Sequence, residues 1–262
     1  RHLFLMCGTN GSALQQSIMG AKVEADGSLG QWSVVGTIPT TVAPDLSATP
    51  VVLGALTPFA ALHANRLTVF GLLGGQSFSV CGTATAAIDG SGIVGPVTVI
   101  RWPEDGASLA SSPGGLAITP GGVLYALRSE SVTPPVYSTR VGPDPTWVRL
   151  PLSTQPDAAT YTSAVFCRGY IYRIGGGTSL AAATGTDRVY SARVEPSGGL
   201  GPWALVGSLP IKMYKAAIVA YEDNIIVLGG QNTAGANLAT MYVAKAQPNG
   251  GITPFFADEA AI

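Results

Sequence analysis

Charged side chains are scarce in this chain. Lys and Arg number 14, Asp and Glu number 15, and together they fill 11% of the 262 positions, for a formal net charge of −1. An ordinary soluble domain carries about 25% charged residues. A protein that binds nucleic acid needs a basic surface to neutralise phosphates. The charge balance therefore predicts no nucleic-acid partner.

Long apolar runs and histidine are also missing. The hydrophobic fraction of 47% is too high for a disordered chain, yet no run approaches the roughly 20 residues that a transmembrane helix needs. We therefore expect no membrane insertion. The only two histidines are His2 and His63, a small supply for metal binding or acid–base catalysis. The expectation is no metal site and no cofactor.

Motifs of enzymes are absent as well. The widely spaced Cys7, Cys81 and Cys167 form no CxxC pair and read as buried free thiols. There is no Gly-x-Ser-x-Gly elbow and no phosphate-binding loop. The adjacent carboxylates Glu104-Asp105 and Glu222-Asp223 fall in predicted loops or turns. These absences predict a protein that is not an enzyme.

What the chain does contain is an internal repeat. Each copy has a segment like Val189–Val194, a Gly-rich turn, and a large apolar closing residue. The five closing residues, 65, 50, 56 and 52 positions apart, are Trp32, Val97, Trp147, Trp203 and Phe255. Each copy follows an apolar run that mostly ends in Gly-Gly or other small residues; these runs are Leu3–Gly8, Leu67–Gly71, Val123–Leu127, Tyr170–Gly176 and Ile225–Gly230.

Each copy reads as four short strands. A first strand, such as Thr162–Phe166 or Ala216–Tyr221, meets the apolar run through a tight turn, which is a hairpin signal. The segment with the Tyr forms the third strand, and the fourth begins at the closing residue. No stretch has a convincing helical period. Four-stranded units at this spacing predict an all-β fold, a β-propeller of four-stranded antiparallel blades with about five blades.

We expect a single propeller domain over residues 1–262. The first copy begins at its second strand, so its blade is predicted to be incomplete. The blades fall at approximately 1–40, 58–105, 114–153, 158–210 and 213–262.

The Gly-Gly doublets, the later Tyr and the later Trp resemble kelch repeats. The form Asp26-Gly-Ser-Leu-Gly-Gln-Trp32 is similar to the divergent kelch-like arrays of bacterial and phage proteins. The resemblance covers essentially the whole chain and is weakest in the third copy, where Arg128-Ser129 replaces Gly-Gly. The turn also looks like that of sialidase-type propellers, but Trp32 is six positions after Asp26 and Ser28 stands where Gly is needed. Copper-binding kelch enzymes need two His and two Tyr around the metal, which this chain has no obvious way to supply.

Variable loops are the candidate binding surface. Loops after the second strand and connections between blades emerge on the same face of a propeller. A binding surface should differ from blade to blade, whereas the recurring Trp and Tyr are expected in the core. We assign ligand or partner contacts to eight polar residues, namely Asp45, Gln76, Ser79, Asp187, Arg188, Gln231, Asn232 and Asn237.

These features predict a non-enzymatic binding or structural module. The expected setting is extracellular or on a virion, as in a phage tail or receptor-binding part. The expected partners are proteins of a larger oligomeric assembly, cell-surface glycan, or both. Two alternatives stay open: a carbohydrate-active propeller enzyme, and a cytoplasmic kelch-type protein–protein adaptor.

Overall fold

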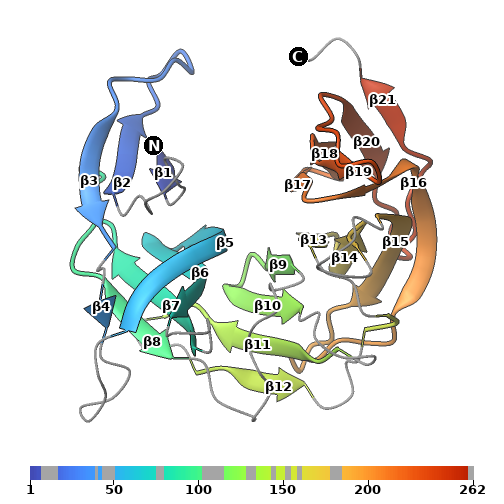
Figure 1. Cartoon of the computed structure of the whole chain (residues 1–262), viewed down its shortest axis with the longest axis horizontal. Helices are drawn as coiled ribbons and strands as arrows, with labels where there is room; N and C mark the ends of the chain where they lie inside the picture. The colour runs from blue at the N-terminus through green and yellow to red at the C-terminus, as the bar shows by residue number, and fades with distance from the viewer. Residues whose placement is uncertain are drawn as a thin grey trace. The chain divides into compact units, whose positions relative to one another are not determined.

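The computed structural model describes residues 1–6, 17–38, 41–42, 51–74, 80–101, 115–127, 134–142, 146–150, 155–157, 161–177 and 185–258. The regular elements among them are all β-strands, and they form five small antiparallel sheets, each built mainly from strands that follow one another in the chain (Figure 1). The predicted class, an all-β protein with the blades of a β-propeller, is confirmed. The Cα trace divides into two compact units, residues 1–110 with 140–146, and residues 111–139 with 147–262.

The first unit contains two sheets. Sheet 1 has three strands, which are β1 (His2–Met6), β2 (Ser17–Lys22) and β3 (Ser33–Thr37). Its three strands agree with the prediction that this blade is incomplete. Sheet 2 consists of β4 (Thr41–Val42), β5 (Val51–His63), β6 (Arg66–Gly74), β7 (Val80–Ala87) and β8 (Thr98–Arg101).

The second unit contains three sheets. Sheet 3 consists of β9 (Gly115–Ile118), β10 (Val123–Leu127), β11 (Val136–Arg140) and β12 (Val148–Leu150). Sheet 4 consists of β13 (Ser163–Cys167), β14 (Tyr170–Ile174), β15 (Thr186–Arg193), β16 (Ala204–Tyr214) and the short β19 (Gln231–Asn232). Sheet 5 consists of β17 (Ala217–Tyr221), β18 (Asn224–Leu228), β20 (Met241–Lys245) and β21 (Phe256–Asp258).

The Gly-rich turns of the repeat have one geometry in four sheets. Each is closed by an antiparallel bridge between residues six apart, at Val23–Leu29, Ile88–Val94, Val194–Leu200 and Ala246–Ile252. The glycine inside each turn has a φ of +84° to +88°, a conformation that Gly adopts without a side-chain clash. The strand that follows the Gly-rich turn begins one residue after the closing residue in all five sheets, whereas the prediction placed its start at that residue.

The core of the second unit lies between neighbouring sheets. One apolar cluster joins sheets 3 and 4, and another joins sheets 4 and 5. The repeated aromatic residues contribute to burial here, since Tyr190, Tyr242 and Phe255 are all less than a tenth exposed. By contrast, Trp32 of sheet 1 is 38% exposed. The first strands also meet, because β13 contacts both β9 and β17.

Candidate functional site

One edge of sheet 4 gathers several connections of the chain. The Gly176 N–H donates to the Met213 carbonyl at 3.0 Å, so the segment after β14 meets the end of β16. The Lys215 N–H donates to the Tyr161 carbonyl at 3.1 Å, which joins the segments that precede β17 and β13. We call this end of sheet 4, where β14 and β16 end and β15 begins, the connection edge. Loops after a second strand and connections between sheets meet here, as the sequence predicts for one face of a propeller.

A buried arginine is the centre of the first polar cluster on this edge. The side chain of Arg173, in β14, is 1% exposed. Its Nη1 donates to Gln155 Oε1 at 3.2 Å and to the Asp157 carbonyl at 3.0 Å, and its Nη2 donates to Asp157 Oδ1. Its guanidinium carbon lies 4.9 Å from the centroid of the Tyr190 ring. A buried charge requires such partners, because desolvation is costly.

The same aspartate also holds two groups nearer to solvent. Asp157 Oδ2 accepts hydrogen bonds from Tyr190 Oη and from Arg188 Nη1, both at 3.2 Å. Arg188 Nη1 lies 3.3 Å from Tyr190 Oη as well. Gln155, Asp157, Arg173, Arg188 and Tyr190 are the arginine–aspartate cluster. Asp157 thus uses both carboxylate oxygens to bind two arginines.

The cluster changes the acidity of its members. Burial raises the pKa of Asp157. The hydrogen bond and positive charge of Arg173, with hydrogen bonds from Tyr190 and Arg188, lower it by more, so the net pKa is below the ordinary 3.8. The hydrogen bond to Tyr190 is the main cause of a raised pKa for Arg188. Both changes favour the charged forms, so the ion pairs persist at neutral pH.

Arg173 is specific to sheet 4. Relative to the first strand of its sheet, its register matches that of Ala126 in β10 and Val227 in β18. The sequence does contain a signal, namely a single cation in an apolar run just before Gly175-Gly176, where both strand faces are expected to be buried. Nothing in the sequence identifies Asp157 as its partner.

A second cluster, the tyrosine–lysine cluster, consists of Tyr161, Tyr214 and Lys215. Lys215 Nζ lies 4.8 Å from the Tyr161 ring centroid and 5.4 Å from that of Tyr214, and the two rings are 6.4 Å apart. These distances allow cation–π attraction. Tyr161 and Lys215 also have left-handed φ angles of +52° and +58°. Such angles cost roughly 1–3 kcal/mol in a residue with a side chain, and the surrounding contacts stabilise them here.

The predicted contact residues Asp187 and Arg188 lie at the start of β15. Arg188 is exposed and belongs to the arginine–aspartate cluster, whereas Asp187 is half-buried. Asp45, Gln76 and Ser79 lie outside the described residues.

Gln231, Asn232 and Asn237 form one turn beside the connection edge. Gln231 and Asn232, as β19, pair with Tyr214 and Met213 at the end of β16. Gln231 Nε2 donates to Asn237 Oδ1 at 3.0 Å, and Asn232 Oδ1 accepts the N–H groups of residues 234 and 236, both at 3.0 Å. These side chains therefore shape the turn, and their contact with a ligand stays a prediction.

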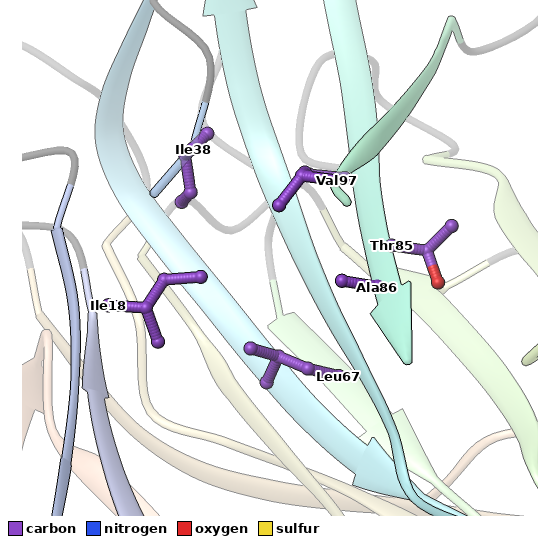
Figure 2. Close-up of a pocket in the computed structure, with 7 residues that line it drawn as sticks. Ile18, Ile38, Leu67, Thr85, Ala86 and Val97 are labelled. Carbon is purple, nitrogen blue, oxygen red and sulfur yellow. The ribbon is translucent and has the colours of Figure 1, made fainter. Parts of the chain in front are cut away.

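A small cavity in the first unit is not a ligand site. It is lined by apolar groups and one threonine, with a volume of about 10 Å³; the residues are Ile18, Ile38, Leu67, Ala84, Thr85, Ala86 and Val97 (Figure 2). Thr85 Oγ1 already accepts a hydrogen bond from Arg66 Nη1 at 3.4 Å. A space of this size and polarity is at the lower limit even for one water molecule.

Two further searches cover only the part of the chain that the structure describes. Within it, no three or more His, Cys, Asp or Glu side chains are placed to hold a metal ion. None of its segments is a helix long and apolar enough to cross a membrane.

No protein-family model matches the chain, and no curated protein sequence matches it either. The chain shares with propellers an architecture of successive antiparallel sheets. Because one architecture serves many functions, the function must be argued from a site. The polar groups that distinguish sheet 4 from its neighbours are the candidate for such a site.

Proposed function

We propose that this chain is a non-enzymatic binding or structural module of the kelch-like propeller type, and that it contacts a protein or a glycan through the connection edge of sheet 4. The propeller fold supports a binding or structural role in general. The observation that carries the specific proposal is the arginine–aspartate cluster, whose central Arg173 has apolar counterparts in sheets 3 and 5. A scaffold that repeats its core but varies one edge is suited to recognition.

The Gly-Gly doublets support the kelch-like assignment. Gly175 and Gly176 have φ angles of +61° and +104°, and Gly229 and Gly230 have +62° and +91°. A Cβ on Gly175 would lie 2.8 Å from the Met213 carbonyl oxygen, and one on Gly230 would lie 2.9 Å from that of Tyr214. Glycine at these positions lets the end of β16 approach both doublets closely.

The binding role fits the cluster better than catalysis does. A general base needs a free lone pair within reach of the substrate proton. The Asp157 carboxylate accepts three hydrogen bonds from protein side chains, and Arg173 lowers its pKa, so it is a weak base whose lone pairs are mostly occupied. The arrangement therefore supports a rigid, charged contact surface.

We place the protein outside the cell or on a virion, in a larger assembly such as a phage tail or receptor-binding part. The low content of charged residues supports this placement. On the edge strand β1, Leu3 and Leu5 are 47% and 60% exposed. Exposed apolar side chains on a sheet edge are suited to coverage by another chain.

The test is saturable binding to intact bacterial cells and to a glycan array, with one edge blocked at a time. Asn237 lies beside the connection edge, and Asn249 lies in the β20–β21 turn at the other end of sheet 5. Both are exposed, and each Oδ1 accepts one hydrogen bond at 3.0 Å. Asn237→Cys and Asn249→Cys, made in a chain with Cys7 and Cys81 replaced by Ser and labelled with a polyethylene glycol maleimide, are therefore matched.

Label at position 237 should abolish binding, and label at position 249 should leave it unchanged. Equal effects of the two labels would contradict the assignment of the binding edge. Absence of binding by a chain with the β-sheet circular dichroism of the folded protein would contradict the binding role itself.

A further inference from the structure

Three exposed cations line the connection edge of sheet 4. Arg188 is the third residue of β15, Lys212 is near the end of β16, and Lys215 directly follows β16. The two strands are antiparallel: Thr186 pairs with Met213, and Arg188 pairs with Ser208 across a bulge. The Gly175 N–H donates to the Arg188 carbonyl at 3.1 Å and the Gly176 N–H to the Met213 carbonyl at 3.0 Å, so one short segment links the backbone of Arg188 to the end of β16.

Few acids oppose these cations. With the buried Arg173, this edge of sheet 4 has four positive side chains against the carboxylates of Asp157 and Asp187. Asp157 is already bound to Arg173 and Arg188. Among the described residues, no carboxylate pairs with Lys212 or Lys215, although Lys215 contacts two tyrosine rings. A chain with a net charge of −1 therefore carries a local excess of positive charge.

Arg188 is oriented for an external partner. Only its Nη1 is used in hydrogen bonds to Asp157 and Tyr190, which hold the guanidinium in place while its side chain stays 56% exposed. Within the described residues, Nη2 and Nε make no hydrogen bond. Two N–H donors on one side of a planar guanidinium match a carboxylate.

Among the described residues, the exposed side chains named on this edge, Arg188, Lys212, Lys215 and Asn237, are polar. The glycines after β14 are buried. On the described strands of sheet 4, the large apolar side chain that is exposed is Leu205, and it lies at the opposite end of β16. The aromatic rings of this edge, Tyr161 and Tyr214, are engaged by Lys215, whereas protein interfaces usually have free apolar or aromatic anchors at their centre. A hydrated, charged ligand fits this edge better than an acidic protein does.

We propose that the connection edge of sheet 4 binds an anionic saccharide, with Arg188 and Lys215 contacting its carboxylates and Lys212 adding to the local positive charge. The proposal rests on the binding function proposed above and specifies its ligand class. Arg188 supplies the geometry for one acid group. Lys215, kept in a left-handed backbone conformation between two tyrosines, supplies a second cation on the other side of the glycine segment.

The experiment measures binding of fluorescent oligogalacturonate, hyaluronan oligosaccharide and sialyllactose, each compared with its methyl ester. The ester keeps the sugar and removes the charge. We expect at least one acid to bind, its ester to bind at least tenfold more weakly, and the affinity to fall as salt is raised from 50 to 200 mM, because exposed charges are screened.

Two matched pairs of variants test the residues. Arg188→Gln is compared with Arg193→Gln, at the opposite end of β15, and Lys215→Gln with Lys245→Gln, at the end of β20; all four side chains are exposed. Losing one charge-assisted hydrogen bond weakens binding by about tenfold, which we expect for Arg188→Gln and Lys215→Gln only. Equal losses in the control variants would overturn the proposal.

Other outcomes also overturn it. These are no binding of any acid in the panel, equal binding of acid and ester, or equally tight binding of polyglutamate or single-stranded DNA, which would indicate a different class of ligand. If the triple variant Arg188→Gln, Lys212→Gln, Lys215→Gln still binds bacterial cells like the native chain, the saccharide proposal fails while the binding function stands. If the folded native chain binds no cells and no saccharide, both fail.

Discussion

The ion pair between Arg173 and Asp157 should be asymmetric in its effect on stability. Arg173 has a side chain that is 1% exposed, whereas that of Asp157 is 29% exposed. Asp157→Asn keeps the shape of the side chain and the carbonyl contact but leaves a buried cation without a counter-charge. Breaking a fully buried pair costs about 3–5 kcal/mol. Because water reaches Asp157, we expect a smaller loss of about 2–3 kcal/mol in the free energy of unfolding.

The substitution Arg173→Met should lower the free energy of unfolding less than Asp157→Asn does. It removes the buried cation together with its Nε, a buried donor for which the described residues supply no acceptor. Asp157 would keep Arg188 and Tyr190 as partners and would remain accessible to water. Val227 and Ala126 at the equivalent positions show that an apolar residue suits this strand. We expect a loss of about 1 kcal/mol or less, since an apolar replacement of a buried ion is often near neutral.

The assay is urea unfolding at neutral pH, monitored by tryptophan fluorescence and by circular dichroism. Agreement of the two probes is needed, because a chain with two compact units can unfold in more than one step. The double variant should be close in stability to Arg173→Met alone, because without the buried cation the aspartate has little left to stabilise. As a control, Asp223→Asn breaks the more exposed pair with Arg168 and should cost less than about 1 kcal/mol. The reasoning is refuted if Arg173→Met destabilises the protein as much as Asp157→Asn.

Three further predictions concern acid stability, the fourth strands and the buried thiol. The folded-state pKa of Asp157 lies below 3.8, so its ionised form contributes stability that is complete above that value and is lost as the pH falls through the folded pKa. The difference in stability between the native chain and Asp157→Asn should therefore disappear in acid unfolding titrations below pH 4. A difference that stays constant would contradict this. A Cβ on Gly36 would lie 2.8 Å from the Cβ of Val94, whereas a Cβ on Gly207 would lie 2.8 Å from the flexible end of an isoleucine side chain. In thermal unfolding, Gly36→Ala should lower the free energy of unfolding by about 1–3 kcal/mol, and Gly207→Ala should lower it clearly less. The reverse order would contradict this packing. Cys167 is 3% exposed, and burial raises the pKa of its thiol. In a variant with the other cysteines replaced by Ser, this thiol should react with a thiol reagent at least a hundredfold faster in urea than in buffer. Rapid reaction of the folded chain would show that the thiol is accessible.

The repeat could be predicted from sequence because its structure is local. The bridge from Val194 to Leu200 spans six residues, and the Glu195 N–H donates to the Gly199 carbonyl at 2.9 Å within the same turn. Glycine with a positive φ and alternating apolar strands are properties of short segments. The closing residues therefore located the start of the strand after each turn to within one residue, as at Trp203 before β16.

The candidate site depended on contacts between segments that the repeat does not relate. Arg188 was identified from sequence because it stands in a variable loop, whereas Asp157 and Arg173 were not identified at all. Gln231 and Asn237 were selected for the same reason as Arg188, yet the structure shows them hydrogen-bonded to each other. A polar side chain in a loop can face a ligand or complete its own turn. The geometry of the loop decides between these two roles, and the amino-acid composition of a loop does not predict that geometry.

The strand–turn units and their Gly-rich turns follow from the sequence, because they arise from hydrogen bonds and alternation over a few residues. Which charges meet depends on how the sheets pack. Asp157 reaches Arg173 across the connection between two sheets, and Lys215 reaches Tyr161 from the connection to the next one. Burial explains this dependence on packing, because an unpaired charge on β14 is unfavourable. Its partner is the carboxylate that the packing of neighbouring sheets brings within hydrogen-bond distance.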